Sequence, residues 1–122
     1  MVKKITIFIF IFLSAVIAIT LMANVFSPKV AQGKYDGFAE CLSNSGAVMY
    51  GAYWCPHCQN EKAAFGDSFR FVNYVECTEE PKRCLANKVE SYPSWLFPDG
   101  RRLAGEQGLE KLSEESGCPL QP

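Results

Sequence analysis

The chain has 122 residues, enough for one domain, and a formal net charge of −1 at pH 7 with 20% charged residues. This balance gives no electrostatic reason to expect a nucleic-acid partner. Histidine occurs once, whereas cysteine occurs six times, well above the background level. The hydrophobic share of 48% is uneven, because much of the excess lies in the first 23 positions.

The N-terminal apolar segment, Ile5 to Ala23, carries no charge and follows Lys3 and Lys4. As a helix its 19 residues would rise about 28 Å, close to the ~30 Å hydrocarbon core of a bilayer. Its length favours an uncleaved membrane anchor over a cleaved signal peptide, for which Leu21 and Ala23 form a poor cleavage site; a buried core helix is the third alternative. With the lysines retained in the cytoplasm, both export interpretations place the remainder in the periplasm or another extracytoplasmic, such as lumenal, space.

We expect three segments: an anchor or uncleaved signal at 1–23, a tether at 24–35, and a folded domain at 36–122. The tether contains Ser27, Pro28 and Gly33 and shows little periodicity. All six cysteines lie in the folded domain. An even number of cysteines in a small exported domain suggests disulfides.

The order of helical and strand patterns predicts an α/β domain. Helices are expected at 37–45 (capped by Asp36), 56–65, 79–90 and 106–116, and strands at 47–53, 71–77, 94–97 and 101–104. The strand at 47–53 is almost uninterrupted in its apolar character, which is typical of a strand buried on both faces of a parallel or mixed sheet. It runs directly into Cys55-Pro56-His57-Cys58 at the expected start of a helix.

The spacing of Cys55 and Cys58 suits thiol–disulfide exchange, which needs one sulfur that attacks as thiolate and a second that resolves the mixed disulfide. The free N–H groups and dipole of the helix start, together with His57, favour the thiolate of Cys55. Pro56 fixes the first turn, and Cys58, one turn further in, is expected to be more buried. The alternative is an inert disulfide clip. A strand followed by such a motif at a helix start is nevertheless typical of thioredoxin-like redox proteins.

A wider set of motifs carries a more specific resemblance. In chain order they are FAECL (38–42), GAVMYGAYWCPHC (46–58), FG (65–66), YVEC (74–77), YPSW (92–95) and SGC (116–118). Together they resemble the thioredoxin-like domain that is fused to, or partners, bacterial and plant vitamin K epoxide reductase homologues. The resemblance covers residues 35–118, although the segment between Cys77 and Cys84 is shorter than usual.

The resemblance implies a function and partners. The domain would pass disulfides to cysteine-containing exported proteins and be reoxidised by a quinone-linked membrane enzyme. Since this chain lacks the membrane reductase domain, we expect a vitamin K epoxide reductase-like membrane protein as a separate partner. We expect no cofactor on the domain itself.

The resemblance also assigns residues around the cysteine pair. It implies that the Tyr92–Pro93 bond is cis, faces the cysteine pair, and leaves the edge of the following strand open to a substrate backbone. Trp54 and Trp95 are expected in the core or at its rim, with the border of a substrate groove as the alternative; we count Trp54, Tyr92 and Pro93 as substrate contacts. Met49 stands where ordinary thioredoxins carry a buried acid, so a carboxylate proton acceptor is missing at that position.

The other four cysteines are expected to form two disulfides. We pair Cys77 with Cys84, because one ends a strand and the other lies in the next helix, and Cys41 with Cys118, at the first and last helices of the domain. Cys41–Cys118 is expected to be structural, and Cys77–Cys84 to be either a structural disulfide or a redox relay. A zinc site is the rival interpretation, but the second pair lacks the short spacing of structural zinc ligands, and export favours disulfides. We therefore expect no metal.

These inferences predict a thioredoxin-like α/β fold, a central mixed β-sheet flanked by helices, behind an N-terminal transmembrane helix. The expected function is that of a membrane-tethered thiol–disulfide oxidoreductase acting mainly as an oxidant. An isomerase or reductase of the same fold is the alternative, because direction depends on the reduction potential and on the reoxidising partner. The non-enzymatic alternative is an anchored, disulfide-stapled binding module that uses the groove at Tyr92–Pro93.

Overall fold

The computed structural model describes residues 1–25 and 32–121. They belong to two units, Met1–Ala31 and Gln32–Pro122. Residues 26–31 of the expected tether lie outside the described residues. Gln32–Tyr35, the end of the expected tether, belong to the second unit, where the Tyr35 N–H donates to Ser68 Oγ at 2.9 Å. The segmentation at 1–23, 24–35 and 36–122 stays a prediction.

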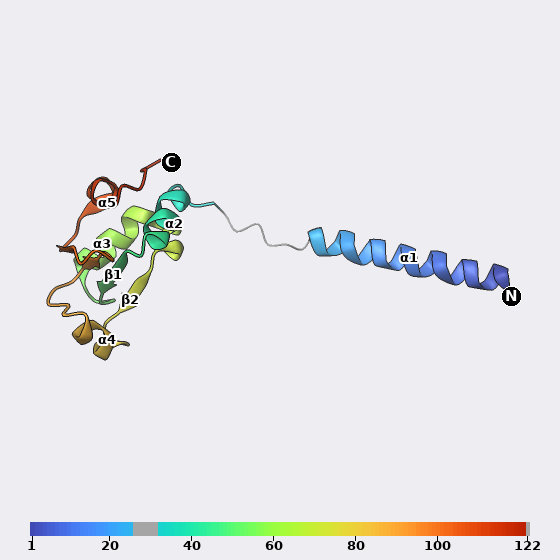
Figure 1. Ribbon diagram of the computed structural model, residues 1–122, viewed down its shortest axis with the longest axis horizontal. Helices are drawn as coiled ribbons and strands as arrows, with labels where there is room; N and C mark the ends of the chain where they lie inside the picture. Colours follow the sequence, from blue (N-terminus) through green and yellow to red (C-terminus); the bar gives the residue numbers. More distant parts are fainter. Residues whose placement is uncertain (26–31, 122) are drawn as a thin grey trace. The chain divides into compact units, whose positions relative to one another are not determined.

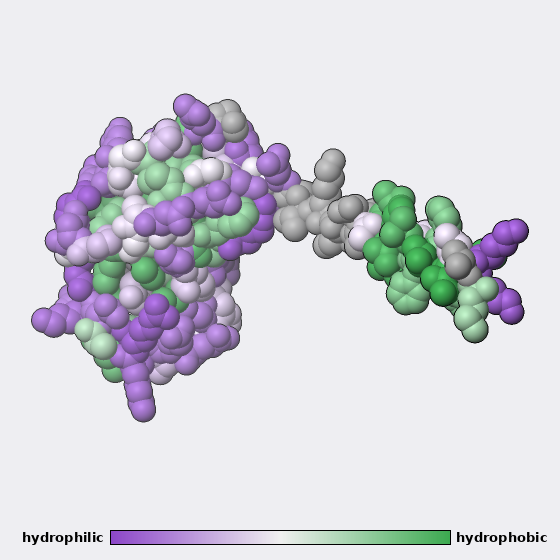
Figure 2. Space-filling view, turned by 45° about the vertical axis from the view of Figure 1, so that its right-hand side comes forward, coloured by the Kyte–Doolittle hydropathy of each residue, from purple (hydrophilic) through white to green (hydrophobic). Residues whose placement is uncertain are grey.

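The described residues of the first unit, 1–25, form the helix α1 (Val2–Val25). Its segment Lys3–Met22 is long and apolar enough to cross a membrane, by length and composition only. A signal sequence near an N-terminus meets the same criteria. The large apolar side chains of this segment are exposed along its length, as its green surface in Figure 2 shows.

The second unit is built on a four-stranded mixed sheet in the order β2-β1-β3-β4. Figure 1 labels its two parallel strands, β1 and β2. The strands are β1 (Val48–Gly51), β2 (Tyr74–Glu76), β3 (Ser94–Leu96) and β4 (Arg102–Ala104). Strand β1 pairs parallel with β2 and antiparallel with β3, which pairs antiparallel with β4. The helices are α2 (Asp36–Asn44), α3 (Pro56–Phe65), η1 (Gly66–Phe71, a 3-10 helix), α4 (Pro81–Ala86) and α5 (Gly108–Ser116). The expected mixed sheet with flanking helices is confirmed.

Alternation along the strands divides the core between the two faces of the sheet. On one face, Met49 and Trp95 pack in one cluster with apolar residues of α2, α3 and α5. On the other face, Tyr50 and Val75 pack with Cys77, which precedes α4, and with Cys84, which lies in α4. Phe65 lies at the centre of the larger cluster, with its ring centroid 5.7 Å from that of Phe38 and 6.1 Å from that of Trp95.

Several element boundaries differ from the sequence-based expectation. The strand expected at 71–77 is shortened to β2, because Gly66 leaves α3 with a positive φ of 56° and residues 66–71 continue as η1. The helix expected at 79–90 is only α4, which ends where Lys88 adopts a positive φ of 52°. Asp36 does not cap α2 from outside; it lies in the first turn and accepts a hydrogen bond from the Gly33 N–H at 2.9 Å.

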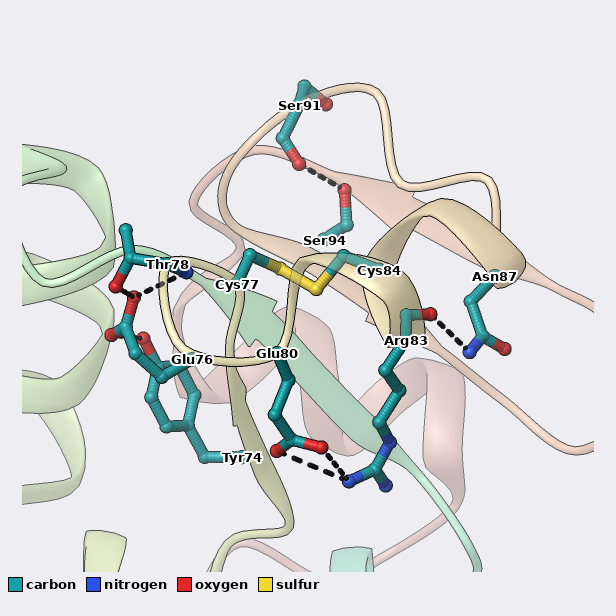
Figure 3. The surroundings of a disulfide bond; sticks show 10 residues. All are labelled: Tyr74, Glu76, Cys77, Thr78, Glu80, Arg83, Cys84, Asn87, Ser91 and Ser94. Carbon is teal, nitrogen blue, oxygen red and sulfur yellow. Dashed lines mark hydrogen bonds and ion pairs between the residues drawn. A yellow bond between two sulfur atoms is a disulfide. The ribbon is translucent and has the colours of Figure 1, made fainter.

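Two disulfides join Cys41 to Cys118 and Cys77 to Cys84, the pairing expected from the sequence. The first ties α2 to the segment after α5, where Gly117 ends the helix in the left-handed region. The second joins the end of β2 to α4 (Figure 3). Cys55 and Cys58 are free thiols.

The two disulfides should contribute unequally to stability. They span 77 and 7 residues, for which the chain-entropy model gives about 4–5 and about 2–3 kcal/mol. Replacing Cys41 and Cys118 with alanine should therefore lower the free energy of unfolding more than replacing Cys77 and Cys84. Denaturant melts of the two double variants of the full chain measure this, and a larger loss in the Cys77/Cys84 variant would reverse the assignment.

Candidate active site

Cys55 lies at the junction between β1 and α3, where it forms the N-cap of the helix. Its own N–H donates to the Ala52 carbonyl at 3.0 Å, closing a turn after the strand. Its Sγ accepts a hydrogen bond from the Cys58 N–H at 3.4 Å, and Pro56 occupies the first turn. The sulfur therefore sits at the positive end of the helix dipole, among N–H groups without helical partners, an environment that stabilises negative charge.

The two cysteines of the motif lie in different surroundings. The Cys55 side chain reaches the surface slightly, with 5% of the residue exposed, whereas Cys58 is fully buried. Burial, reinforced by the hydrogen bond with Cys55, raises the pKa of the Cys58 thiol to about 12. Cys58 thus holds its proton at neutral pH, while Cys55 is the sulfur that an incoming group can reach.

The Tyr92–Pro93 peptide bond is cis, as the resemblance implied, and lies against the cysteine pair. The Cys55 thiol donates to the Tyr92 carbonyl at 3.6 Å. Trp54 packs edge-on against Tyr92 with ring centroids 6.1 Å apart and remains 58% exposed. Pro93 itself is buried, so its ring shapes the site from beneath. The structure brings together Trp54, Cys55 and Tyr92.

Trp95 does not border a groove. It is fully buried in the larger core cluster, next to Phe65. Its indole Nε1–H donates to the carboxylate of Glu61 at 3.3 Å. The sequence alternative that placed Trp95 beside a substrate groove is therefore wrong, because β3 presents this residue to the face covered by α3.

Glu61 is a buried carboxylate that the sequence analysis missed. It projects from α3, is 1% exposed, and also accepts hydrogen bonds from the N–H groups of Gln107 at 2.8 Å and Gly108 at 3.3 Å. Burial raises the pKa of Glu61 even though these donors oppose the shift. In the sequence, Glu61 looks like any polar residue on the exposed face of a helix, and nothing in the neighbouring residues indicates that its carboxylate is buried.

Glu106 is a second residue that the sequence analysis did not place at the site. Its carboxylate lies 3.0 Å from Nδ1 of His57 and accepts a hydrogen bond from the side-chain amide of Asn60 at 3.2 Å. These contacts lower the pKa of Glu106. Both side chains of the pair border a hollow formed with Gly105, Gln107 and Gly108. His57, the expected activator of Cys55, therefore carries an acidic partner.

The described residues contain no group of three or more histidine, cysteine or acidic side chains suited to a metal ion. Cys77 and Cys84 are joined to each other, and both are buried. The rival zinc interpretation used Cys55, Cys58, Cys77 and Cys84 as its four ligands, and two of these are held in a disulfide. This excludes the proposed set of four thiolates.

Known proteins that are similar to this chain include a curated oxidoreductase and solved thioredoxins. No family model matches the chain. The chain is 38% identical over 91 residues to the thiol-disulfide oxidoreductase LTO1 of Arabidopsis thaliana, a match that covers 67% of this chain and 24% of the relative. It therefore spans about a quarter of the length of the curated relative it matches.

Similar solved structures are thioredoxins. The thioredoxin of Fasciola hepatica aligns with a TM-score of 0.46 and 24% identity over 58% of this chain and 76% of its own. Mitochondrial thioredoxin 3 of Saccharomyces cerevisiae aligns with a TM-score of 0.38 and 19% identity over 59% and 74%. The fold of the second unit is thioredoxin-like. Its mixed sheet, the cysteine pair at the start of α3 and the cis-proline before β3 form the arrangement expected for that class.

The pair of His57 and Glu106 should tune the oxidising strength of the cysteine pair. Removing the imidazole in His57→Ala should make the Cys55–Cys58 disulfide a weaker oxidant, because a positive partner of the thiolate is lost. Removing the carboxylate charge in Glu106→Gln should make it a stronger oxidant, because a negative neighbour of the thiolate is lost. Because the pair is exposed, we expect shifts on the order of 10 mV, measured by equilibration with glutathione buffers.

A double variant separates this effect from a general change of the surface. In His57→Ala the additional Glu106→Gln change should have a smaller effect than it has alone. Glu114→Gln, which removes a charge from α5, serves as the matched control. Equal potentials for all of these variants would exclude His57 and Glu106 from the tuning of the site.

Proposed function

We propose that this protein is a thiol–disulfide oxidoreductase that exchanges disulfides with cysteine-containing exported proteins through Cys55 and Cys58. The observation that carries the proposal is the asymmetry of the pair. One sulfur caps α3 at the rim of the site, and the other is buried one turn further along the same helix. Attack and resolution by two such sulfurs is the chemistry of this class of enzyme.

In the oxidising direction a substrate thiolate attacks Sγ of Cys55 in the Cys55–Cys58 disulfide. The bond between the two cysteines breaks, and the Cys58 sulfur leaves with its electron pair and takes up a proton. A second substrate thiolate then attacks the substrate sulfur of the mixed disulfide and releases Cys55 as thiolate. The substrate has lost two electrons and gained a disulfide, and the cysteine pair has been reduced.

The surface beside Cys55 suits an extended substrate segment. Trp54 and Tyr92 present aromatic side chains there, and the Tyr92 carbonyl points to the attacked sulfur. Exposed aromatic groups next to a reactive sulfur can bind apolar neighbours of a substrate cysteine at low entropic cost. We assign Trp54 and Tyr92 to substrate contact, with Pro93 shaping the site from below.

Turnover as an oxidant requires an acceptor for the two electrons left on the cysteine pair. We infer a quinone-linked, vitamin K epoxide reductase-like membrane protein, because the motif set resembles domains that work with such enzymes. An N-terminal anchor formed by α1 would hold the domain beside this partner on the extracytoplasmic side of the membrane. Reductase or isomerase activity uses the same residues and differs in the partner that restores the starting state.

Cys77–Cys84 is better suited to a structural role than to a relay. Both residues are buried beneath Tyr50 and Val75 on the face of the sheet covered by α4. Exchange requires a thiolate to approach along the sulfur–sulfur axis, and burial limits that approach. We therefore assign both Cys77–Cys84 and Cys41–Cys118 to stabilisation of the fold.

A trapping experiment tests the proposed function. In Cys58→Ala the mixed disulfide on Cys55 cannot be resolved, so exported proteins from the host's extracytoplasmic fraction should remain covalently attached to the full chain. Cys55→Ala, with Cys58 buried, should trap little. Non-reducing electrophoresis and mass spectrometry of the linked proteins measure this.

The two alternatives give different results in the same experiment. A binding module would retain partners without a covalent link, and its partners would survive in Cys55→Ala. An isomerase would trap proteins that contain several cysteines with non-native pairing. If no protein becomes covalently linked to Cys55 in the Cys58→Ala variant, the proposed function is contradicted.

A further inference from the structure

The burial of Cys58 raises a question that the proposed function leaves open. Each round of exchange converts this residue between a thiol and a disulfide sulfur, so one proton must enter or leave. Cys58 has no exposed surface, and its pKa of about 12 means that the thiol does not release the proton unaided. Met49, which stands in β1 where ordinary thioredoxins carry a buried acid, is itself buried and cannot accept the proton.

The space above Gly51 connects Cys58 to a second polar group. A β-carbon built on Gly51 would lie 2.9 Å from Sγ of Cys58 and 3.2 Å from the phenolic oxygen of Tyr74. The thiol and the phenol therefore border one space that is too tight for a β-carbon, and the two polar atoms lie close enough for a proton to pass between them through at most one water molecule. The absence of a side chain at residue 51 leaves this approach open.

From the phenol a hydrogen-bonded path continues toward solvent. The Tyr74 hydroxyl donates to Oε2 of Glu76 at 2.7 Å. The other carboxylate oxygen accepts from the Thr78 hydroxyl at 2.8 Å and from the Thr78 N–H at 3.3 Å. Figure 3 shows these three residues converging at the end of β2, beside the Cys77–Cys84 loop. Glu76 is only half-buried, whereas Cys58 is fully enclosed.

The charges around this path suit proton transfer. The groups that face Cys58 are Cys55, Lys62, Tyr74 and, through the phenol, Glu76. Burial and the neighbouring carboxylate raise the pKa of Tyr74, so the phenol passes a proton on rather than staying ionised. Burial opposes the shift at Glu76, but hydrogen bonds from Tyr74 and Thr78 keep its pKa below the usual value, so it is an ionised acceptor at neutral pH.

Lys62 favours the loss of the proton from Cys58. Its ammonium group lies 3.6 Å from the centroid of the Tyr74 ring, and its charge favours the thiolate of Cys58. A cation held on the aromatic face stabilises negative charge that develops on the phenol or on the neighbouring sulfur. Lys62 therefore lowers the cost of the transient state without accepting the proton itself.

We propose that Tyr74 and Glu76 carry the proton of Cys58 between its buried sulfur and solvent, a role that rests on the proposed exchange at Cys55–Cys58. When Cys58 resolves a mixed disulfide, its proton passes to the Tyr74 oxygen and the hydroxyl proton of Tyr74 passes to Glu76. The Cys58 sulfur forms its bond to Cys55, and the departing group leaves with the electron pair of the broken disulfide as a thiolate. Glu76 then releases the proton to water, and the reverse sequence protonates Cys58 when it is the leaving sulfur.

The test follows the two steps separately in the reduced full chain reacting with glutathione disulfide. Acid quenching and mass spectrometry give the rate at which glutathione attaches to Cys55 and the rate at which Cys58 displaces it. In the wild-type chain the second rate should be flat with pH above the pKa of Glu76. In Tyr74→Phe the first rate should be unchanged, and the second should fall about 100-fold near pH 7 and rise in proportion to hydroxide.

Matched variants distinguish the proton path from a change in packing. Glu76→Gln should slow the second step as Tyr74→Phe does, while Tyr35→Phe and Glu79→Gln, which make the same chemical changes elsewhere, should behave as wild type. A wild-type rate and pH profile for the second step in both Tyr74→Phe and Glu76→Gln would overturn the proposal. Failure of the wild-type chain to form any adduct on Cys55 would instead contradict the proposed function.

Discussion

The arrangement of the site depends on one buried carboxylate. Glu61 leaves α3 one turn after Cys58 and accepts hydrogen bonds from the Trp95 indole and from two N–H groups at the start of α5. It thereby ties together the helix that carries the cysteines, the strand that follows the cis-proline, and the segment that carries Glu106. Without this acceptor, three donors would lose their partner, and each buried one costs about 1–3 kcal/mol. Through these hydrogen bonds Glu61 fixes α3, β3 and the start of α5 around the reacting sulfurs.

Cys55 and Cys58 lie in contrasting environments, although the same helix positions both. At the first turn, the Cys55 sulfur accepts a hydrogen bond from the Cys58 N–H, and His57, two residues on, pairs with Glu106. One turn on, Cys58 is enclosed by the core and opposed by the Tyr74 phenol across Gly51. The first environment favours a reactive thiolate, and the second favours a thiol that ionises only when the proton can be passed on. A single CxxC motif therefore offers the two kinds of sulfur that thiol–disulfide exchange requires.

The sequence predicts the local part of this arrangement well. An apolar strand that runs into Cys55-Pro56 specifies a helix start, since proline is favoured in the first turn, and the spacing to Cys58 then follows. The Cys77–Cys84 disulfide also follows from the sequence, because its two cysteines lie in consecutive elements, whereas Cys41–Cys118 joins the first helix of the domain to the segment after the last one. The boundaries of β2 and α4 were less predictable, because residues 66–71 form a 3-10 helix ahead of β2 and because Lys88 adopts a positive φ just after α4, where hydrophobic patterning alone would extend the helix. Glu61, Glu106 and the contact of Tyr74 with the gap above Gly51 were not predictable, since each depends on residues more than 20 positions away that only the folded chain brings together.

The most direct test of this account is a redox titration of all six cysteines in the full chain. The chain is equilibrated with glutathione buffers of increasing oxidising strength, quenched with an alkylating agent, and mapped by mass spectrometry. We expect Cys55 and Cys58 to change together, in one two-electron transition, while Cys41–Cys118 and Cys77–Cys84 stay intact across the range. A titration in which Cys55 and Cys58 never form a mutual disulfide, or in which another pair exchanges in their place, would contradict the account.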